Sequence, residues 1–238
     1  MAIAETTVRE IALEQPASIR VFEQLGIDYC CGGRKPLAQA CAEHALNLDH
    51  VLQTIAEASA ENGEVPRNWE DESLSALCRH IAARHHGYIR SELPRLEMLM
   101  QKVVSRHGNT QPELAAIQSI LLPFGRELLE HLDKEEMVLF PYISNLQPED
   151  GICRPLGCFG SVRHPIERMM AEHDGAGEAM ARMRELSSGF TAPDWACPTY
   201  RGLYQALREF ERDLHQHVHL ENNILFPRAI QLEQTIPE

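Results

Sequence analysis

Apolar residues recur along most of the chain with the period of an amphipathic α-helix, and the alternation typical of β-strands is nearly absent. Residues 7–60 predict several short helices, the second opening at Pro16. A polar stretch near residues 61–70 then indicates a linker or domain boundary. Longer helical patterns follow it, and we expect these helices at about 72–107, 111–146, 163–188 and 198–232.

The connections between the long helical patterns are short, except for a loop that begins near Gln147. Long amphipathic helices with mostly short connections predict an up-down-up-down four-helix bundle. Pro94 predicts a kink in the first of these helices, because proline removes a backbone donor. The expected fold is therefore all-α, with a small helical N-terminal domain at residues 1–65 and a four-helix bundle at residues 70–238.

Charge and cysteine content narrow the class of protein. The 238 residues include 22 basic and 35 acidic ones, for a formal net charge of −13, which disfavours nucleic acid or an anionic membrane as a partner. No apolar run approaches the roughly 20 residues that cross a bilayer, and Glu5 interrupts any secretory leader. Seven scattered cysteines suggest reduced thiols, so we expect a cytoplasmic protein.

One sequence motif occurs twice within the long helical patterns. HLDKEEMVLFP at residues 131–141 nearly repeats as HVHLENNILFP at residues 217–227. In each copy a His precedes a Glu by four positions, a helical rise of about 6 Å that puts both side chains on one face. The two remaining long helices also carry histidines, among them His80, His85 and His86 in the first and His173 in the third.

These residues suit a pair of adjacent metal ions. Two His–Glu pairs with one His from each other helix provide four imidazoles and two carboxylates, a set that favours iron or manganese over zinc or an iron–sulfur cluster. If both carboxylates bridge the ions, at least one coordination position stays open for a small molecule. A purely structural interpretation, in which the histidines are hydrogen-bonded helix residues, predicts no tightly bound metal.

Two adjacent cysteines, Cys30 and Cys31, precede Gly32 and Gly33. Neighbouring cysteines rarely bond to each other, and the glycines leave the backbone open and the sulfurs approachable. A position at a helix start or beside Arg34 and Lys35 would lower a thiol pKa and make it reactive; the alternative is a turn with incidental cysteines. Two further cysteines in the long loop fit either a redox or metal pair or, more simply, unconnected thiols, and the remaining three fit small apolar positions: Cys153 and Cys158, then Cys41, Cys78 and Cys197.

The combination of GIDYCCGG, HLDKEEMVLFP, AEHDGAGEAM and HVHLENNILFP resembles the iron–sulfur cluster repair di-iron proteins, the repair of iron centres family of the hemerythrin-like superfamily, over nearly the whole chain. The resemblance implies two non-haem iron ions with oxo or hydroxo and carboxylate bridges. It assigns their ligands to His86, His131, Glu135, His173, His217 and Glu221, with His85 as the alternative to His86. It also implies that Cys30 and Cys31 take part in repair, by accepting iron or by contacting the damaged protein.

The resemblance implies repair or protection of iron–sulfur clusters damaged by nitric oxide or oxidants, by iron donation or by binding and reducing nitric oxide. Oxygen-carrying hemerythrins use five histidines and this pattern has four, which disfavours oxygen transport. The first rival is a hemerythrin-like sensor that binds oxygen or nitric oxide without turnover. A ferritin-type oxidase is disfavoured because its Glu-x-x-His pairs sit three residues apart. The expected partners are damaged iron–sulfur proteins and a small gas ligand. The sequence leaves open whether the chain forms a homodimer.

Overall fold

The computed structural model describes residues 5–30, 32–61, 69, 71–147 and 160–235. Within these ranges the regular secondary structure is helical, and the β-type pairing is an isolated bridge between Thr7 and Pro36. The expected all-α fold is confirmed. Cys31, the centre of the predicted linker and the loop with Cys153 and Cys158 lie outside the described residues. None of the described helices has the length and apolar character that crossing a membrane requires.

The chain forms two compact units. Residues 1–72 and residues 215–227 make up the first, and residues 73–214 and 228–238 make up the second. The first unit therefore includes a segment far away in the sequence, which carries the second copy of the repeated motif. The predicted division at residues 65–70 stays a prediction.

Short helices build the N-terminal part of the first unit. A capping box starts the first of them: the Thr7 hydroxyl accepts a hydrogen bond from the Glu10 N–H, and the Glu10 carboxylate accepts one from the Thr7 N–H. The second helix ends at Gly26, whose φ of 70° suits glycine. Phe22 and Tyr29 are fully buried in the core. The helices are α1 (Val8–Glu14), α2 (Ala17–Leu25), α3 (Leu37–Glu43) and α4 (Leu48–Glu61).

The turn after α2 is fixed from both ends. The Asp28 carboxylate accepts hydrogen bonds from the backbone N–H groups of Cys30 and Gly32, each at 2.8 Å. At the other end, the Gly33 carbonyl accepts a hydrogen bond from the Arg9 N–H at 2.8 Å. Local hydrogen bonds thus set the backbone at Cys30, Gly32 and Gly33.

Gly33→Ala should destabilise the protein, because a Cβ there would lie 2.5 Å from the Tyr29 carbonyl oxygen, a backbone atom. We expect the free energy of unfolding to fall by roughly 1–3 kcal/mol, as for other overpacked sites. Gly175→Ala is the matched control, since a Cβ within helix α9 (Arg163–Leu186) meets nothing within 4 Å. It should leave stability unchanged or raise it by about 0.5–1 kcal/mol. Chemical denaturation measures both, and equal effects would contradict the argument.

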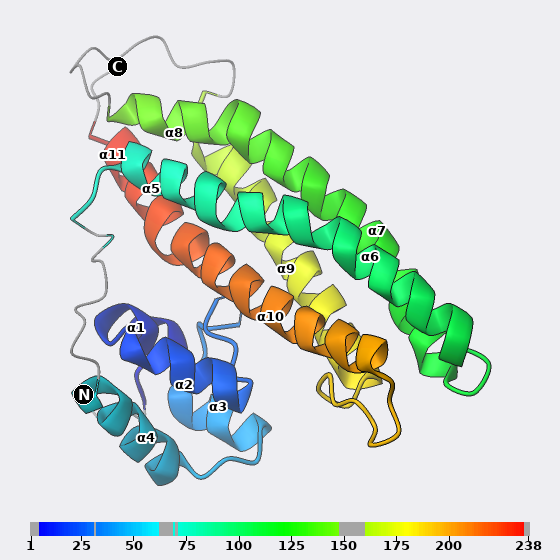
Figure 1. Ribbon diagram of the computed structural model, residues 1–238. Helices are drawn as coiled ribbons and strands as arrows, with labels where there is room; N and C mark the ends of the chain where they lie inside the picture. Colours follow the sequence, from blue (N-terminus) through cyan, green and yellow to red (C-terminus); the bar gives the residue numbers. More distant parts are fainter. Residues whose placement is uncertain (1–4, 31, 62–68, 70, 148–159, 236–238) are drawn as a thin grey trace. The chain divides into compact units, whose positions relative to one another are not determined.

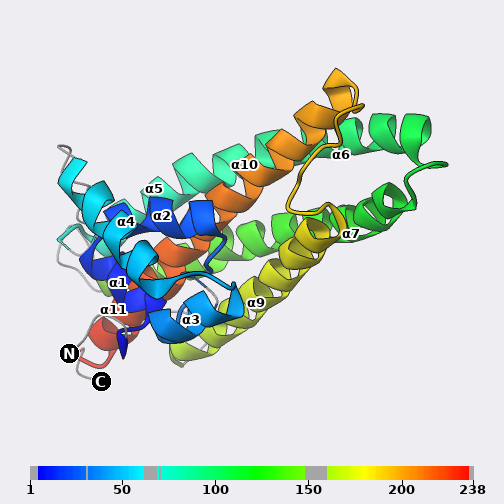
Figure 2. The same cartoon turned by 90° about the horizontal axis from the view of Figure 1, so that it is seen from below.

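The second unit is built on long helical rods, and Figures 1 and 2 show successive rods running in opposite directions. The first rod contains α5 (Leu74–Ile81), η2 (Ala82–His86) and α6 (Gly87–His107). The second contains α7 (Pro112–Lys134), η3 (Glu135–Leu139) and α8 (Phe140–Leu146), and α9 forms the third. The fourth contains α10 (Pro198–Leu220), η4 (Glu221–Leu225) and α11 (Phe226–Glu233), and residues 215–227 of this rod belong to the first unit. The expected helices of the bundle are confirmed, with bounds within a few residues.

Side chains tie the rods of the second unit together. The Arg184 guanidinium of α9 donates to both carboxylate oxygens of Glu211 on α10, at 2.6–3.0 Å. Phe210 packs against Tyr88 of α6 and Phe124 of α7, with ring centroids 6.2 Å apart in each pair. Pro94 lies inside α6, as its place in the sequence predicted. Aromatic packing and an ion pair between a buried carboxylate and a partly exposed guanidinium thus hold α6, α7, α9 and α10 together.

Candidate metal centre

Glu135 is the central carboxylate of the candidate site. It begins η3, one turn after His131 at the end of α7, and its side chain is fully buried. One carboxylate oxygen, Oε1, lies 3.4 Å from Nε2 of His131, and the other, Oε2, lies 3.5 Å from Nε2 of His86. Each oxygen therefore faces a different imidazole. A carboxylate so placed can bridge two cations.

The other ring nitrogen of each histidine also contacts a carboxylate. Nδ1 of His86 lies 2.8 Å from Oε1 of Glu136, and Nδ1 of His131 lies 2.9 Å from Oε2 of Glu172. If Nδ1 donates its hydrogen there, Nε2 keeps its lone pair and points toward Glu135. Both rings are thus oriented to offer the same nitrogen to the site.

Glu172 is held in its charged form by its neighbours. Burial alone would raise its pKa, but hydrogen bonds from Lys134, His131 and Arg168 outweigh burial and lower the pKa to about 2. Lys134 reaches both carboxylate oxygens, at 2.7 and 2.9 Å. A carboxylate that stays ionised at neutral pH is a lasting acceptor for the His131 ring.

His173 and the second motif copy supply the remaining candidate ligands. Nε2 of His173, on α9, lies 3.0 Å from Nε2 of His131. In the other copy, Nε2 of His217 lies 3.0 Å from Oε1 of Glu221, and both side chains are fully buried. The four-residue His–Glu spacing therefore gives a close pair in both copies of the motif.

Ligand atoms of the six predicted residues gather in two groups, and within each group all of them lie within 4.8 Å of one another. One group contains His86 and His217, and the other contains His131 and His173; Glu135 and Glu221 belong to both groups. Two groups that share two carboxylates match what a pair of carboxylate-bridged ions requires.

Burial of Glu135 supports a cation at this place. Among the described residues, neither of its carboxylate oxygens has a hydrogen-bond partner. A buried carboxylate without donors is costly, and such groups are normally paired with a cation or bound to a metal. The imidazole and carboxylate donors present therefore fit two iron ions.

His85, the alternative first-helix ligand, belongs to neither group. Its Nδ1 lies 3.2 Å from Oδ2 of Asp213, which also accepts a hydrogen bond from Arg84 through Oδ1 at 3.1 Å. The structure therefore places His86, and not its neighbour, beside Glu135. Sequence reasoning missed Asp213 and also Glu136 and Glu172, because their distance from the histidines along the chain gives no pattern.

The π-helical segments at the candidate ligands were also not predicted. His86 ends η2, Glu135 begins η3 and Glu221 begins η4. The N–H of Phe140 bonds to the carbonyl of Glu135, five residues back, as in a π-turn. Such wide turns occur often at functional sites. The Phe-Pro that ends both motif copies was a usable signal, since proline cannot continue the α-helical hydrogen bonding.

Cys30 differs from the expectation of an approachable sulfur. It is 6% exposed, and its thiol donates a hydrogen bond to the Asp28 carboxylate, with Sγ and Oδ1 3.2 Å apart. Lys35, expected near the thiols, pairs instead with Glu43 at 2.5 Å. The difference arises because the Asp28 carboxylate accepts hydrogen bonds from both the backbone N–H and the thiol of Cys30, which keeps this side chain buried in the turn. Of the other cysteines, Cys41 lies in the core, where burial raises its thiol pKa.

Within the first unit, the Cys30 turn is tied to the segment that carries the second motif copy. The amide of Asn223 donates to the Tyr29 carbonyl at 3.3 Å, and the Tyr29 ring packs edge-on against His219 with centroids 5.3 Å apart. Glu23 accepts hydrogen bonds from both the Tyr29 hydroxyl and the Gln216 amide, at 3.0 and 2.9 Å. The cysteine turn is therefore positioned by the same helical segment as His217 and Glu221.

The fold and the shared-carboxylate groups define a hemerythrin-type cation-binding protein. Residues 77–229 match the Hemerythrin HHE cation binding domain, and residues 4–59 match a domain of unknown function, DUF542. The iron–sulfur cluster repair protein YtfE of Pectobacterium atrosepticum is 33% identical over 233 residues, covering 98% of this chain and 100% of the relative. The chain belongs to the iron–sulfur cluster repair family of hemerythrin HHE proteins.

Other relatives agree over the same length. A probable iron–sulfur cluster repair protein of Haemophilus influenzae is 34% identical over 233 residues, which is 97% of this chain and 99% of the relative. The YtfE protein of Salmonella newport is 32% identical over 230 residues, with the same coverage of 97% and 99%. The resemblance noted from the motifs is thus confirmed along the full chain, including the N-terminal part with Cys30.

Proposed function

We propose that this protein repairs or protects iron–sulfur clusters damaged by nitric oxide or oxidants, using a di-iron centre. The observation that carries the proposal is the pair of ligand groups that share Glu135 and Glu221. The full-length likeness to iron–sulfur cluster repair proteins supports the same function. Its setting would be the cytoplasm, with damaged iron–sulfur proteins as partners.

Six residues would hold the iron ions. His86 and His217 would bind one, His131 and His173 the other, and the two shared carboxylates would bridge them. When bound, the iron pair supplies either ferrous iron for a damaged cluster or electrons for nitric oxide. The protein's part is to orient the imidazoles, through carboxylates such as Glu136, and to bury the site.

Cys30 and Cys31 would act in the repair step as thiols that accept iron or contact the damaged protein. The support is the link between the Cys30 turn and the helical segment of His217 and Glu221, formed by Tyr29 and Asn223. Because Cys30 is buried and hydrogen-bonded to Asp28, its thiol has to be uncovered before it reacts.

Anaerobic purification followed by metal analysis tests the di-iron centre, and we expect roughly two irons per chain, with oxo-bridge absorption in the near-ultraviolet after air oxidation. A single zinc or no metal would overturn the proposal.

The repair activity is tested next: the diferrous protein is mixed with a nitric-oxide-damaged iron–sulfur protein, and recovery of cluster absorbance is followed. Release of nitrous oxide would identify nitric oxide reduction. Nitric oxide binding without release of nitrous oxide and without cluster recovery would instead favour the alternative function, a sensor that binds the gas without turnover.

A further inference from the structure

Two carboxylates contact the histidines of the candidate site at the ring nitrogen that faces away from the site, one in each ligand group. Glu136 contacts Nδ1 of His86, and Glu172 contacts Nδ1 of His131, at nearly equal distances of 2.8 and 2.9 Å. The two histidines belong to different ligand groups. Each metal position therefore has its own positioning carboxylate outside the ligands.

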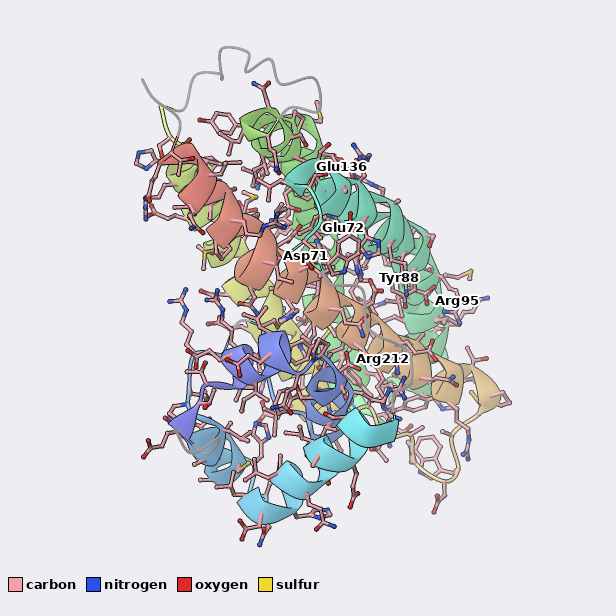
Figure 3. All side chains as sticks on the ribbon, turned by 90° about the vertical axis from the view of Figure 1, so that its left-hand side faces the viewer. Asp71, Glu72, Tyr88, Arg95, Glu136 and Arg212 are labelled. Carbon is pink, nitrogen blue, oxygen red and sulfur yellow. The ribbon has the colours of Figure 1, made fainter. Side chains whose placement is uncertain are left out.

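The charged neighbours of these two carboxylates differ. Glu136 receives one cation, the Arg90 guanidinium at 3.2 Å, which is shared with Asp133 at 2.9 Å. This set carries a net negative charge. Figure 3 labels Glu136, whose side chain is 35% exposed.

Glu172 receives two cations. Lys134 lies 2.7 Å from Oε1, and Arg168 lies 3.1 Å from the same oxygen. No second carboxylate shares them in the contacts of the described residues. This set carries a net positive charge, opposite to the set around Glu136.

Opposite outer charges act differently on a bound cation. A net negative set of charges makes the imidazole a stronger donor and attracts the ion that the imidazole binds. A net positive set makes the imidazole a weaker donor and repels that ion. The ligand atoms themselves cannot cancel the difference, because both groups offer two imidazoles and the same two carboxylates. The ion bound at His131 should therefore be held less tightly than the ion bound at His86.

We propose that the two metal positions are not equivalent, and that the ion bound at His131 is released before the ion bound at His86. This inference rests on the proposed function and deepens it, because it identifies which iron is available for donation. Glu136 and Glu172 are the positioning residues that set the order, through His86 and His131.

Release of iron from the full-length protein tests the order. Anaerobically loaded diferrous protein is mixed with excess of a coloured ferrous chelator, and absorbance is followed in time. We expect two phases of equal amplitude, one iron each, whose rates differ by about 10-fold or more, the usual size of effects from residues behind metal ligands. High salt should bring the two rates closer, since the cations are partly exposed.

Charge variants assign the phases. Glu172→Gln should accelerate only the fast phase, and Glu136→Gln only the slow phase; glutamine keeps an acceptor for Nδ1 and removes the charge. Lys134→Gln should slow the fast phase several-fold, an effect that structural damage would not produce. Lys102→Gln, exposed on α6, is the matched control for loss of a surface cation and should change neither rate.

The outcomes separate this inference from the proposed function. A single release phase, or a fast phase accelerated by Lys134→Gln, would overturn the inference while two bound irons leave the proposed function standing. A protein that binds no iron would overturn both.

Discussion

Glu135→Gln should abolish the binding of both irons while the metal-free protein stays folded. The two oxygens of Glu135 face His86 and His131 separately. Glutamine replaces one of them with an NH2 group, which cannot bind a cation, and leaves the other as a neutral and weaker donor, so both groups are impaired. We expect metal affinity to fall by more than about 100-fold, beyond the usual effect of residues behind the ligands. Metal analysis after anaerobic reconstitution measures the loss.

The same variant makes an opposite prediction for stability. Glu135 is fully buried, and its oxygens have no hydrogen-bond partner among the described residues, so the charge is costly without a metal. Glutamine should leave the free energy of unfolding of the metal-free protein unchanged or raise it by up to about 3 kcal/mol. Glu130→Gln, exposed on α7, is the control and should retain both irons. Two irons retained by the Glu135 variant would refute the bridging role.

Acidification of the metal-free protein should destabilise it through His219. Burial, with a smaller contribution from Arg9, lowers the pKa of this imidazole to about 4. In the unfolded chain the histidine pKa is near 6.5. Between pH 6.5 and 4 the imidazole therefore binds a proton in the unfolded state but not in the folded state. The stability present above pH 6.5 is therefore lost as the pH falls toward 4. By pH 4.5 the loss should be about 2–3 kcal/mol.

His219→Gln isolates this contribution. The variant loses packing against Tyr29 at every pH, but it has no imidazole to protonate. The stability difference between the wild type and the variant should therefore shrink steadily between pH 6.5 and 4.5 in denaturant titrations. His50→Gln, on the exposed face of α4, is the control for removing a histidine. A difference that stays constant with pH would show that His219 is not kept neutral by burial.

The sequence predicted the helices because their apolar period is long and regular, and it predicted the two motif copies because they repeat. The six candidate ligands came together as the spacing and the resemblance implied. Glu172 could not be predicted, since its contact with His131 depends on how α7 and α9 pack. The burial of Cys30 also escaped, because it depends on how the Asp28 carboxylate closes its own turn.

A wide turn changes the phase of a helix. Each π segment uses one residue more than an α-helical turn, which rotates the next part of the helix by about 100° around the axis. In the second rod this happens at Glu135, after Leu128 and Leu132 and before Phe140 and Ile143, all of them buried. A substitution scan along this rod would therefore show two amphipathic helices joined out of step, with the candidate metal-binding carboxylate at the joint.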